Sequence, residues 1–234
     1  MAQTQGNVPP GTGNTGGTPS GDPSPASDGL PPGQDGLPPG QTWRSELPVM
    51  HYGPVPKVKD PDKWLLWFWG WSAVGPGTDR ELDLHHARTL TLADIRSLKQ
   101  TRLVSDLHCG QKWSVKGTSW QGVLARDIVE RFPPGEGVQN VMVFAEYGYS
   151  ATVRLEDLTS SEALLATHLD GEPLTPEHGF PIRLILPHLY SWKGPKWLRG
   201  WEYLRDPRRG FWEERGYHIT GDPWHEERYS YQEV

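Results

Sequence analysis

Short apolar runs separated by turn residues follow one another along the chain from Trp43 onward. The first of them, 63–69, reads Lys-Trp-Leu-Leu-Trp-Phe-Trp, and its aromatic content favours a β-strand. Similar runs predict further strands over 101–107, 114–120, 138–144, 149–155, 182–186 and 197–204. The pattern indicates a domain built mainly from short strands.

Helical signals are fewer. Segment 91–98 opens with Thr91, a residue type whose hydroxyl suits a helix N-cap. Segment 122–132 carries apolar residues near helical spacing, namely Val123, Leu124, Ile128 and Phe132. A third short helix is expected to start near 159–160. Because strands do not alternate regularly with long helices, the predicted fold class is α+β rather than a doubly wound sheet.

The first 42 residues have a different composition: Gly, Pro, Ser, Thr, Asn, Asp and Gln predominate, with almost no apolar side chains. The sequence Gly-Leu-Pro-Pro-Gly-Gln occurs twice, at 29–34 and 36–41. Such a segment cannot bury enough apolar surface to offset the entropy lost on ordering. We therefore predict a disordered tail over 1–42 and one folded domain over 43–234.

The formal net charge of -6 and the pI of about 5.8 give the chain no general attraction to nucleic acid or to an anionic membrane. No apolar run approaches the roughly 18 residues of a membrane-spanning helix, and the N-terminus lacks the basic and apolar regions of a secretory signal. We expect a cytoplasmic, monomeric protein with small-molecule or protein partners, without nucleic-acid binding or membrane insertion.

Cys109 is the only cysteine, so it cannot form an intramolecular disulfide. It follows an apolar run and precedes a glycine, which places it at a strand end or in the following loop, where functional side chains are common. His108 and Lys112 are expected to lower the pKa of its thiol, because nearby positive charge favours the thiolate. The residues alone leave open core packing, a nucleophile paired with a histidine, or a metal ligand, although zinc is disfavoured without a second cysteine.

Two other segments carry candidate binding residues. Segment 176–199 contains several cations that suit a phosphate or another anion, namely Arg183, Lys193, Lys196 and Arg199. For any one of these cations taken alone, a solvated surface position is the more common explanation. In segment 51–56, a histidine and a tyrosine precede a stiff Pro-Val-Pro stretch. That stretch suits either a binding loop or a plain linker.

In chain order these segments resemble the molybdopterin-binding domain of the sulfite oxidase family, which includes the periplasmic methionine-sulfoxide reductase catalytic subunit. The resemblance runs from about Leu47 to Tyr229. Segment 51–56 is similar to the family's Asn-His-x-Pro-Val-Pro motif, and 178–183, His-Gly-Phe-Pro-Ile-Arg, to a pterin-binding motif. The spacing Cys-x-x-x-Trp-Ser at 109–114 is similar to a shorter, cytoplasmic branch that lacks the haem domain.

The resemblance implies a sulfite-oxidase-type fold of mixed β-sheets with short peripheral helices, and a molybdenum-molybdopterin cofactor. It places Cys109 at the family's metal ligand, with a catalytic role, and Tyr149 at its active-site tyrosine, with Tyr147 as a close competitor. The cofactor contacts that it implies are His51, Tyr52, His178, Arg183, Lys193 and Lys196. A soft thiolate suits a redox-active metal that also carries the sulfur ligands of the pterin.

Departures from the family pattern bear on the substrate. Met50 stands where vertebrate-type sulfite oxidases carry a substrate-binding arginine, and Ser114 stands at the position of a second one. Without those charges, sulfite is expected to bind poorly. The predicted activity is therefore oxygen-atom transfer to or from another small substrate, such as a sulfoxide or an N-oxide. Its electrons are exchanged with a separate redox protein, because the sequence carries no haem, flavin or iron-sulfur signature.

Three alternatives remain at this point. One is a sulfite dehydrogenase that uses other cations, such as Lys112. Another is a hydrolase with a Cys109-histidine pair, which would be active without a metal. The third is a non-catalytic binding module, suggested by the 12 tryptophans.

Overall fold

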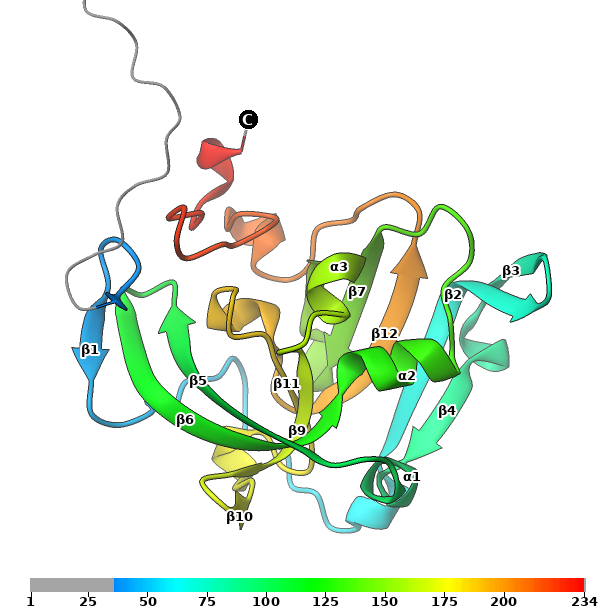
Figure 1. Cartoon of the computed structure of the whole chain (residues 1–234), viewed down its shortest axis with the longest axis horizontal. Helices are drawn as coiled ribbons and strands as arrows, with labels where there is room; N and C mark the ends of the chain where they lie inside the picture. Colours follow the sequence, from blue (N-terminus) through cyan, green and yellow to red (C-terminus); the bar gives the residue numbers. More distant parts are fainter. Residues whose placement is uncertain (1–35, 234) are drawn as a thin grey trace, which may run out of the picture.

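The computed structural model describes residues 36–233. Two mixed β-sheets of six strands each form the body of the molecule (Figure 1). The first sheet contains β1 (Thr42–Arg44), β5 (Thr101–Cys109), β6 (Trp113–Leu124), β9 (Leu164–Leu169), β10 (Glu172–Pro173) and β11 (Arg183–Ile185). The second contains β2 (Leu65–Gly75), β3 (Thr78–Leu82), β4 (Arg88–Thr91), β7 (Asn140–Ala145), β8 (Ser150–Arg154) and β12 (Leu198–Leu204).

β6 organises the first sheet. It pairs with β5 in antiparallel fashion along most of its length. Its start also pairs in parallel with β1, and its end pairs antiparallel with β9. Since β9 in turn pairs with β11, this sheet brings Cys109 at the end of β5 and Arg183 at the start of β11 into one layer.

The second sheet has the order β3-β2-β12-β7-β8, with β4 paired to the first half of β2. β12 runs parallel to β2 and antiparallel to β7. Gly200 makes the parallel contact possible, because a Cβ at that position would lie 1.8 Å from the carbonyl oxygen of Trp67 and its φ is +128°. A left-handed backbone in so close a contact suits glycine alone.

Short helices cover the sheets: α1 (Leu92–Ser97), α2 (Ala125–Arg131) and α3 (Leu155–Leu158). Thr91 is the N-cap of α1, and its hydroxyl accepts a hydrogen bond from the Asp94 N–H. The Asp94 carboxylate accepts one from the Thr91 N–H in return, which completes a capping box. The 3-10 helices are η2 (Pro61–Lys63), η3 (Leu84–His86), η4 (Glu146–Gly148), η5 (Pro176–His178), η6 (Ser191–Lys193), η7 (Glu213–Arg215) and η8 (Ser230–Gln232).

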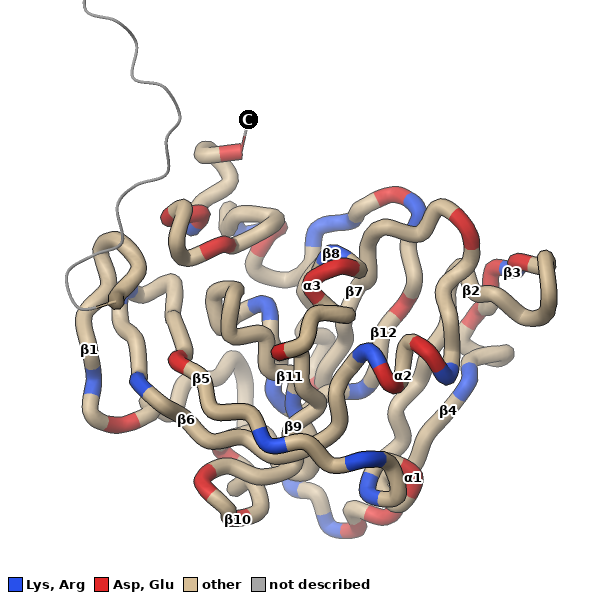
Figure 2. The backbone as a smooth tube through the Cα atoms, in the orientation of Figure 1, with Lys and Arg blue, Asp and Glu red and all other residues tan. Residues whose placement is uncertain are grey.

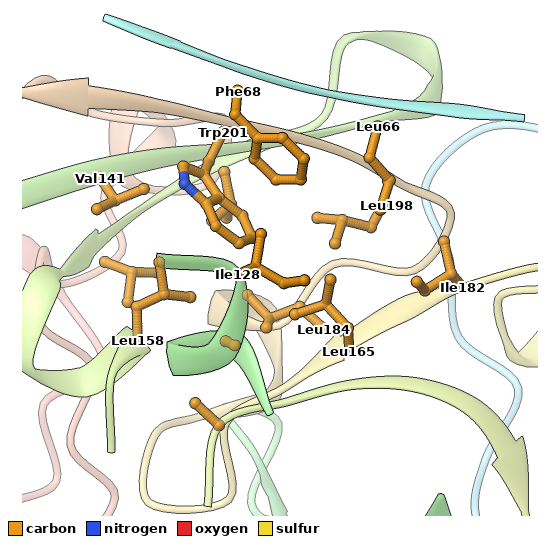
Figure 3. Close-up of a cluster of buried hydrophobic side chains, with 14 of the residues drawn as sticks. Leu66, Phe68, Ile128, Val141, Leu158, Leu165, Ile182, Leu184, Leu198 and Trp201 are labelled. Carbon is orange, nitrogen blue, oxygen red and sulfur yellow. The ribbon is translucent and has the colours of Figure 1, made fainter. Parts of the chain in front are cut away.

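The main core lies between the sheets and α2. Figure 3 shows Ile128 of α2 among side chains from both layers, with Phe68 and Trp201 from the second sheet and Leu165 and Leu184 from the first. A second, smaller cluster lies on the first sheet around Leu107, Trp120, Leu124 and Ile185. The two layers therefore share one apolar interior that holds the strand ends in place.

The α+β prediction and the seven predicted strands are confirmed. β6 continues to Leu124, however, so the helix predicted from 122 begins at Ala125: Gly122 lies so close to β9 that a Cβ there would be 1.9 Å from the Leu165 carbonyl oxygen. The expectation of a helix starting near 159–160 is wrong, because the Thr159 hydroxyl donates to the Leu155 carbonyl and closes α3 there. The sequence patterns missed β1, β3, β4, β9 and β10.

Most of the predicted tail, residues 1–35, lies outside the described residues. The rest of it differs from the prediction: Gln41 is buried and β1 begins at Thr42, so ordered structure starts before residue 43. Within the described part of the chain, no helix has the length and apolar character needed to cross a bilayer.

We predict that Ile128→Ala lowers the free energy of unfolding by about 2–5 kcal/mol, because it empties a fully buried position between the sheets. Leu84→Ala is the matched control, since Leu84 is 59% exposed and its truncation is expected to change stability by less than about 0.5 kcal/mol. Urea unfolding followed by tryptophan fluorescence measures both. Equal effects of the two substitutions would contradict the assignment of the core.

Candidate functional site

A cavity of about 350 Å³ opens where β5 ends and β6 begins. Its walls come from segments far apart in the sequence, around residues 47–52, 107–113, 146–149, 178–197 and 212–217. Most of the residues predicted to form the site line this cavity: His51, Tyr52, Cys109, Tyr149, His178, Arg183 and Lys196. The fold therefore gathers three of the sequence segments singled out above into one site.

Cys109 is the last residue of β5, as predicted. Strand alternation puts Leu107 and Cys109 on the cavity wall, whereas the ring of His108 lies on the other face, with Nδ1 2.8 Å from the Ser114 hydroxyl. Lys112 is exposed and does not line the cavity. Burial raises the pKa of the Cys109 thiol. The prediction that His108 and Lys112 lower this pKa is therefore wrong.

The turn after Cys109 is fixed from two sides. The Cys109 carbonyl accepts hydrogen bonds from the Lys112 N–H and from the side-chain amide of Gln41, each 3.0 Å long. On the cavity side, a Cβ at Gly110 would lie 2.5 Å from the ring of Trp192. Glycine at this position therefore lets the indole pack directly against the turn that carries the thiol.

One end of the cavity is cationic. Arg183 is 5% exposed, its Nη1 donates to the His178 carbonyl at 3.1 Å, and its guanidinium lies 5.0 Å from the Trp120 ring centroid. Among the described residues no carboxylate pairs with Arg183, and its Nε is buried without a partner. The Lys196 ammonium donates to the carbonyls of Met50 (2.7 Å) and Glu177 (2.6 Å).

Desolvation weakens the charged form of each of these groups. Burial lowers the pKa of Arg183 to about 10. Burial and the Arg183 charge lower the pKa of Lys196 to about 7. The pKa of His178 is also lowered, by burial first and then by the two neighbouring cations. Arg183 is buried, and Lys196 and His178 are half-buried. The Glu177 carboxylate offsets only part of their mutual repulsion, so a bound anion relieves a remaining cost.

Aromatic side chains form the other walls: Tyr52, Trp113, Trp192, Trp197, Trp212 and Tyr217. Trp192 stacks on Tyr190 with 4.9 Å between ring centroids and meets Tyr217 edge-on at 4.8 Å. Tyr52, although half exposed, packs on Phe211 at 4.4 Å. The site therefore combines a cationic end with an aromatic surround, and Cys109 faces the same space.

Tyr149 lines the cavity and donates its hydroxyl hydrogen bond to the Trp192 carbonyl at 2.5 Å. Burial, with smaller contributions from Glu213, Tyr217 and Cys109, raises its pKa well above the usual value for tyrosine. Tyr147 is 49% exposed and does not line the cavity. The geometry therefore favours Tyr149 over Tyr147 as the tyrosine of the site.

Lys193 requires a correction, because the structure does not place it with the cofactor-binding residues. Its side chain is 1% exposed, and its Nζ lies 2.5 Å from the carboxylate of Glu213 and donates to the Ile219 carbonyl. Glu213 also accepts from the backbone N–H groups of Thr152 and Gly210. Lys193 thus holds the C-terminal part of the chain against the site, while Lys196, three residues later, faces the cavity.

Arg199 also has a structural partner. Its Nε pairs with Glu146 at 2.5 Å, and its guanidinium lies 3.6 Å from the ring centroid of Trp64. His51 lines the cavity but is exposed, with Nδ1 2.9 Å from the Gly53 carbonyl and its ring edge-on to Trp197 at 5.8 Å.

Sequence reasoning missed the aromatic walls and Gln41. Trp192 lies in segment 176–199, which was singled out for its charges, whereas Trp212 lies outside the segments singled out. Nothing in the sequence pattern places either ring on the wall of the cavity that Cys109 lines. Gln41 lies in the repeat assigned to the tail. A contact between residues 68 positions apart leaves no periodic signal in either segment.

Comparison with known proteins identifies relatives. The family described as "Oxidoreductase molybdopterin binding domain" matches residues 52–212. The chain is 38% identical over 187 residues to the uncharacterized oxidoreductase YuiH of Bacillus subtilis (strain 168), covering 80% of this chain and 88% of that protein. It is 29% identical over 180 residues to an NAD(P)H nitrate reductase of Betula pendula, covering 64% of this chain and 19% of the reductase.

The sulfane dehydrogenase SoxCD from Paracoccus pantotrophus has a similar fold, with a TM-score of 0.55 and 15% identity. The superposition covers 67% of this chain and 41% of that one. The sulfite-oxidase-type fold predicted from the sequence motifs is confirmed.

We predict that Lys193→Met lowers the free energy of unfolding by about 3–5 kcal/mol, because it leaves the buried Glu213 carboxylate without its cation. The double variant Lys193→Met, Glu213→Gln should recover part of that loss. Urea unfolding of both variants and the wild type measures the difference. A Lys193→Met protein as stable as the wild type would contradict the role assigned to this pair.

We predict a pH-dependent anion affinity at the cationic end. Free Lys196 loses its proton above about pH 7, and a bound dianion favours the ammonium. Binding of sulfate, whose charge is constant in this range, should therefore weaken by up to about tenfold per pH unit between pH 7.5 and 9. In Lys196→Gln the affinity should be weaker and nearly independent of pH there. Isothermal titration calorimetry of the cofactor-free proteins measures the sulfate affinity of the wild type and of Lys196→Gln. The same pH dependence in both proteins would refute the role assigned to Lys196.

Proposed function

Because the chain belongs to the family of oxidoreductase molybdopterin-binding domains, we propose that it reduces a small neutral oxide, such as a sulfoxide or an N-oxide. The chain is an oxidoreductase with a molybdenum-molybdopterin cofactor. That cofactor supplies two-electron oxygen-atom transfer when bound. For a sulfoxide the balance is two electrons and two protons taken up, with a sulfide and water as products.

The residues of the cavity fit this cofactor. Cys109 offers one soft thiolate, the ligand type that a molybdenum centre with pterin sulfurs accepts. The buried Nε of Arg183 has no partner within the described residues, and a phosphate would provide one. Lys196 and His178, beside it, would contact the phosphate and the polar edges of the pterin. In this proposal His51 and Tyr52 close the cavity over the pterin from the N-terminal segment.

The distribution of charge in the cavity carries the proposal for the substrate. The lysine and arginine side chains that line it, Lys196 and Arg183, gather at the end assigned to the cofactor. Away from that end the lining is mostly apolar and aromatic, with Leu107, Trp192 and Tyr217, and Arg228, whose charge acts on the Cys109 thiol, does not line the cavity. A small dianion such as sulfite would be desolvated there without a cation in the cavity wall to pair with, which is costly. A neutral, polarised S–O or N–O group loses much less hydration in the same environment.

Met50 and Ser114, which stand where vertebrate-type sulfite oxidases carry substrate-binding arginines, also support a neutral substrate. Met50 lines the cavity with an uncharged thioether side chain. Ser114 is fully buried behind the Cys109 turn, between His108 and Gln41, and does not line the cavity. Lys112, the cation on which the sulfite alternative depended, is exposed outside it. These placements disfavour sulfite as the substrate.

Tyr149 has a positioning role in this proposal. Its raised pKa keeps the phenol protonated, and its hydroxyl holds the backbone of Trp192. That hydrogen bond sets one side of the space that the substrate enters. In this proposal the electrons are exchanged with a separate redox protein, because Cys109, the single cysteine of this sequence, is already assigned to the molybdenum.

We predict that holoenzyme reduced by dithionite-treated methyl viologen turns over methionine sulfoxide or trimethylamine N-oxide and leaves sulfite unoxidised in the presence of ferricyanide. Viologen absorbance and ferricyanide absorbance measure the two directions. Robust sulfite oxidation without oxide reduction would overturn the substrate proposal.

Metal analysis tests the cofactor assignment independently of the substrate proposal. Wild-type protein from a host that makes the cofactor should contain nearly stoichiometric molybdenum and pterin. In Cys109→Ser, oxide reduction should fall by at least about a hundredfold, as for loss of a group that contacts the reacting centre. Ser97→Ala, a substitution of an exposed serine at the end of α1, is the control and should leave metal content and activity unchanged.

A further inference from the structure

Four aromatic rings form a continuous chain from the cavity to the protein surface. Trp192 and Tyr217 line the cavity, and their ring centroids are 4.8 Å apart. The ring centroids of Tyr217 and Tyr229 are 6.0 Å apart. Tyr229 stacks on Tyr231 with 5.5 Å between ring centroids and an interplanar angle of 16°. Figure 1 shows the C-terminal segment that carries the last two rings, in red, at the outer edge of the molecule.

The outer end of this chain is exposed. Tyr231 is 81% exposed and Tyr229 is 40% exposed, and Trp224 in the same segment is 38% exposed. Exposed large aromatic side chains that gather in one short segment are typical of a surface that contacts another molecule. The inner end, by contrast, touches the turn of the metal-ligand residue, because Trp192 packs against Gly110.

The segment is also held firmly, so its rings are presented in a fixed arrangement. Tyr217 and Tyr229 form an isolated antiparallel bridge. Arg209 pairs with Glu233, and the Glu233 carboxylate also accepts from the Ile219 N–H. An ordered surface of this kind costs little further entropy when a partner binds.

The segment is acidic. Residues 211–233 contain six acidic residues and two arginines. Two of the acids pair with cations from outside this range, Glu213 with Lys193 and Glu233 with Arg209, so that the segment keeps a small net negative charge. One arginine, Arg228, is buried and pairs with Glu226, whereas Glu214 is 64% exposed at its side chain. Figure 2 shows acidic positions along this part of the chain. A partner with a basic contact face complements this surface and is steered to it at low salt.

We propose that the surface formed by Tyr229 and Tyr231 is the docking site of the electron-exchange protein. The partner is a one-electron carrier whose redox group reaches its surface within a basic rim. Single electrons pass between that group and the metal site through the packed rings by tunnelling, so that no bond forms or breaks and no ring is oxidised. Two successive encounters exchange the two electrons of one turnover. The proposal rests on the proposed function in one respect, that electrons come from a separate protein.

The test uses holoenzyme reduced with dithionite, freed of excess reductant and mixed with ferricytochrome c in a stopped-flow instrument. Ferricytochrome c is a basic protein with an exposed haem edge, and its absorbance reports electron transfer without any substrate. Tyr231→Ser should lower the second-order rate constant by at least about fivefold, and Tyr231→Phe, which keeps the ring, should retain it. Val104→Ser removes an exposed apolar side chain of β5 and should have no effect.

A second part of the test changes the charge of this surface. Glu214→Lys should slow the reaction and flatten its dependence on salt, whereas Glu172→Lys on β10 should not. Ferricyanide, a small oxidant that needs no protein docking surface, should oxidise all variants at the wild-type rate. Equal rates for Tyr231→Ser and Val104→Ser with ferricytochrome c would overturn the proposal. So would a concentration-dependent dimer that Tyr231→Ser abolishes, because the surface would then bind a second copy of the chain.

The outcome is independent of the substrate. If Tyr231→Ser slows electron transfer in this assay but no oxide is turned over, the docking proposal stands and the substrate proposal fails. If oxides are turned over and Tyr231→Ser does not change the rate of electron transfer, the substrate proposal stands and the docking proposal fails.

Discussion

The buried ion pair between Lys193 and Glu213 connects the parts of the molecule that make the site. Both side chains are almost completely shielded from water, so each charge depends on the other and on the hydrogen bonds that complete its shell. Glu213 takes those bonds from Thr152 in β8 and from Gly210, and Lys193 gives one to Ile219. The pair therefore ties η6 to the second sheet and to the C-terminal segment. Trp192, next to Lys193, and Tyr217, close to Glu213, meet beside Cys109 as a result.

At the cationic end of the cavity, burial of side chains opposes their charge. The apolar interior that stabilises the sheets also desolvates Arg183, Lys196 and His178, and the pKa of each falls accordingly. The Glu177 carboxylate offsets part of this effect for Lys196 and His178, and the cavity leaves room for an anion beside them. Stability and cofactor binding thus work against each other at this end, and the ligand resolves the conflict.

The sequence revealed those features whose chemistry is local. Cys109 at a strand end and the His178 to Lys196 cluster lie in short motifs, so their placement followed from neighbouring residues. Features that depend on distant pairing were not predictable in this way: β1 has only three residues and no periodicity, and its position comes from β6. Lys193 and Lys196 are chemically identical and three positions apart, and only the turn at η6 determines which one faces Glu213.

The range of the family match divides the site in an informative way. Residues 52–212 include Cys109 and the cationic end of the cavity, which the proposed function assigns to the cofactor. Gln41 behind the Cys109 turn, Tyr217 in the cavity wall and the rings of Tyr229 and Tyr231 all lie outside that range. The proposed cofactor contacts therefore lie mostly in the matched part, whereas Tyr217 in the C-terminal flank adds to the cavity wall and Tyr229 and Tyr231 add to the exposed surface. Under the proposed function, substrate and partner therefore depend in part on the flanking segments, although the N-terminal flank also reaches the cationic end, where the Met50 carbonyl accepts from the Lys196 ammonium.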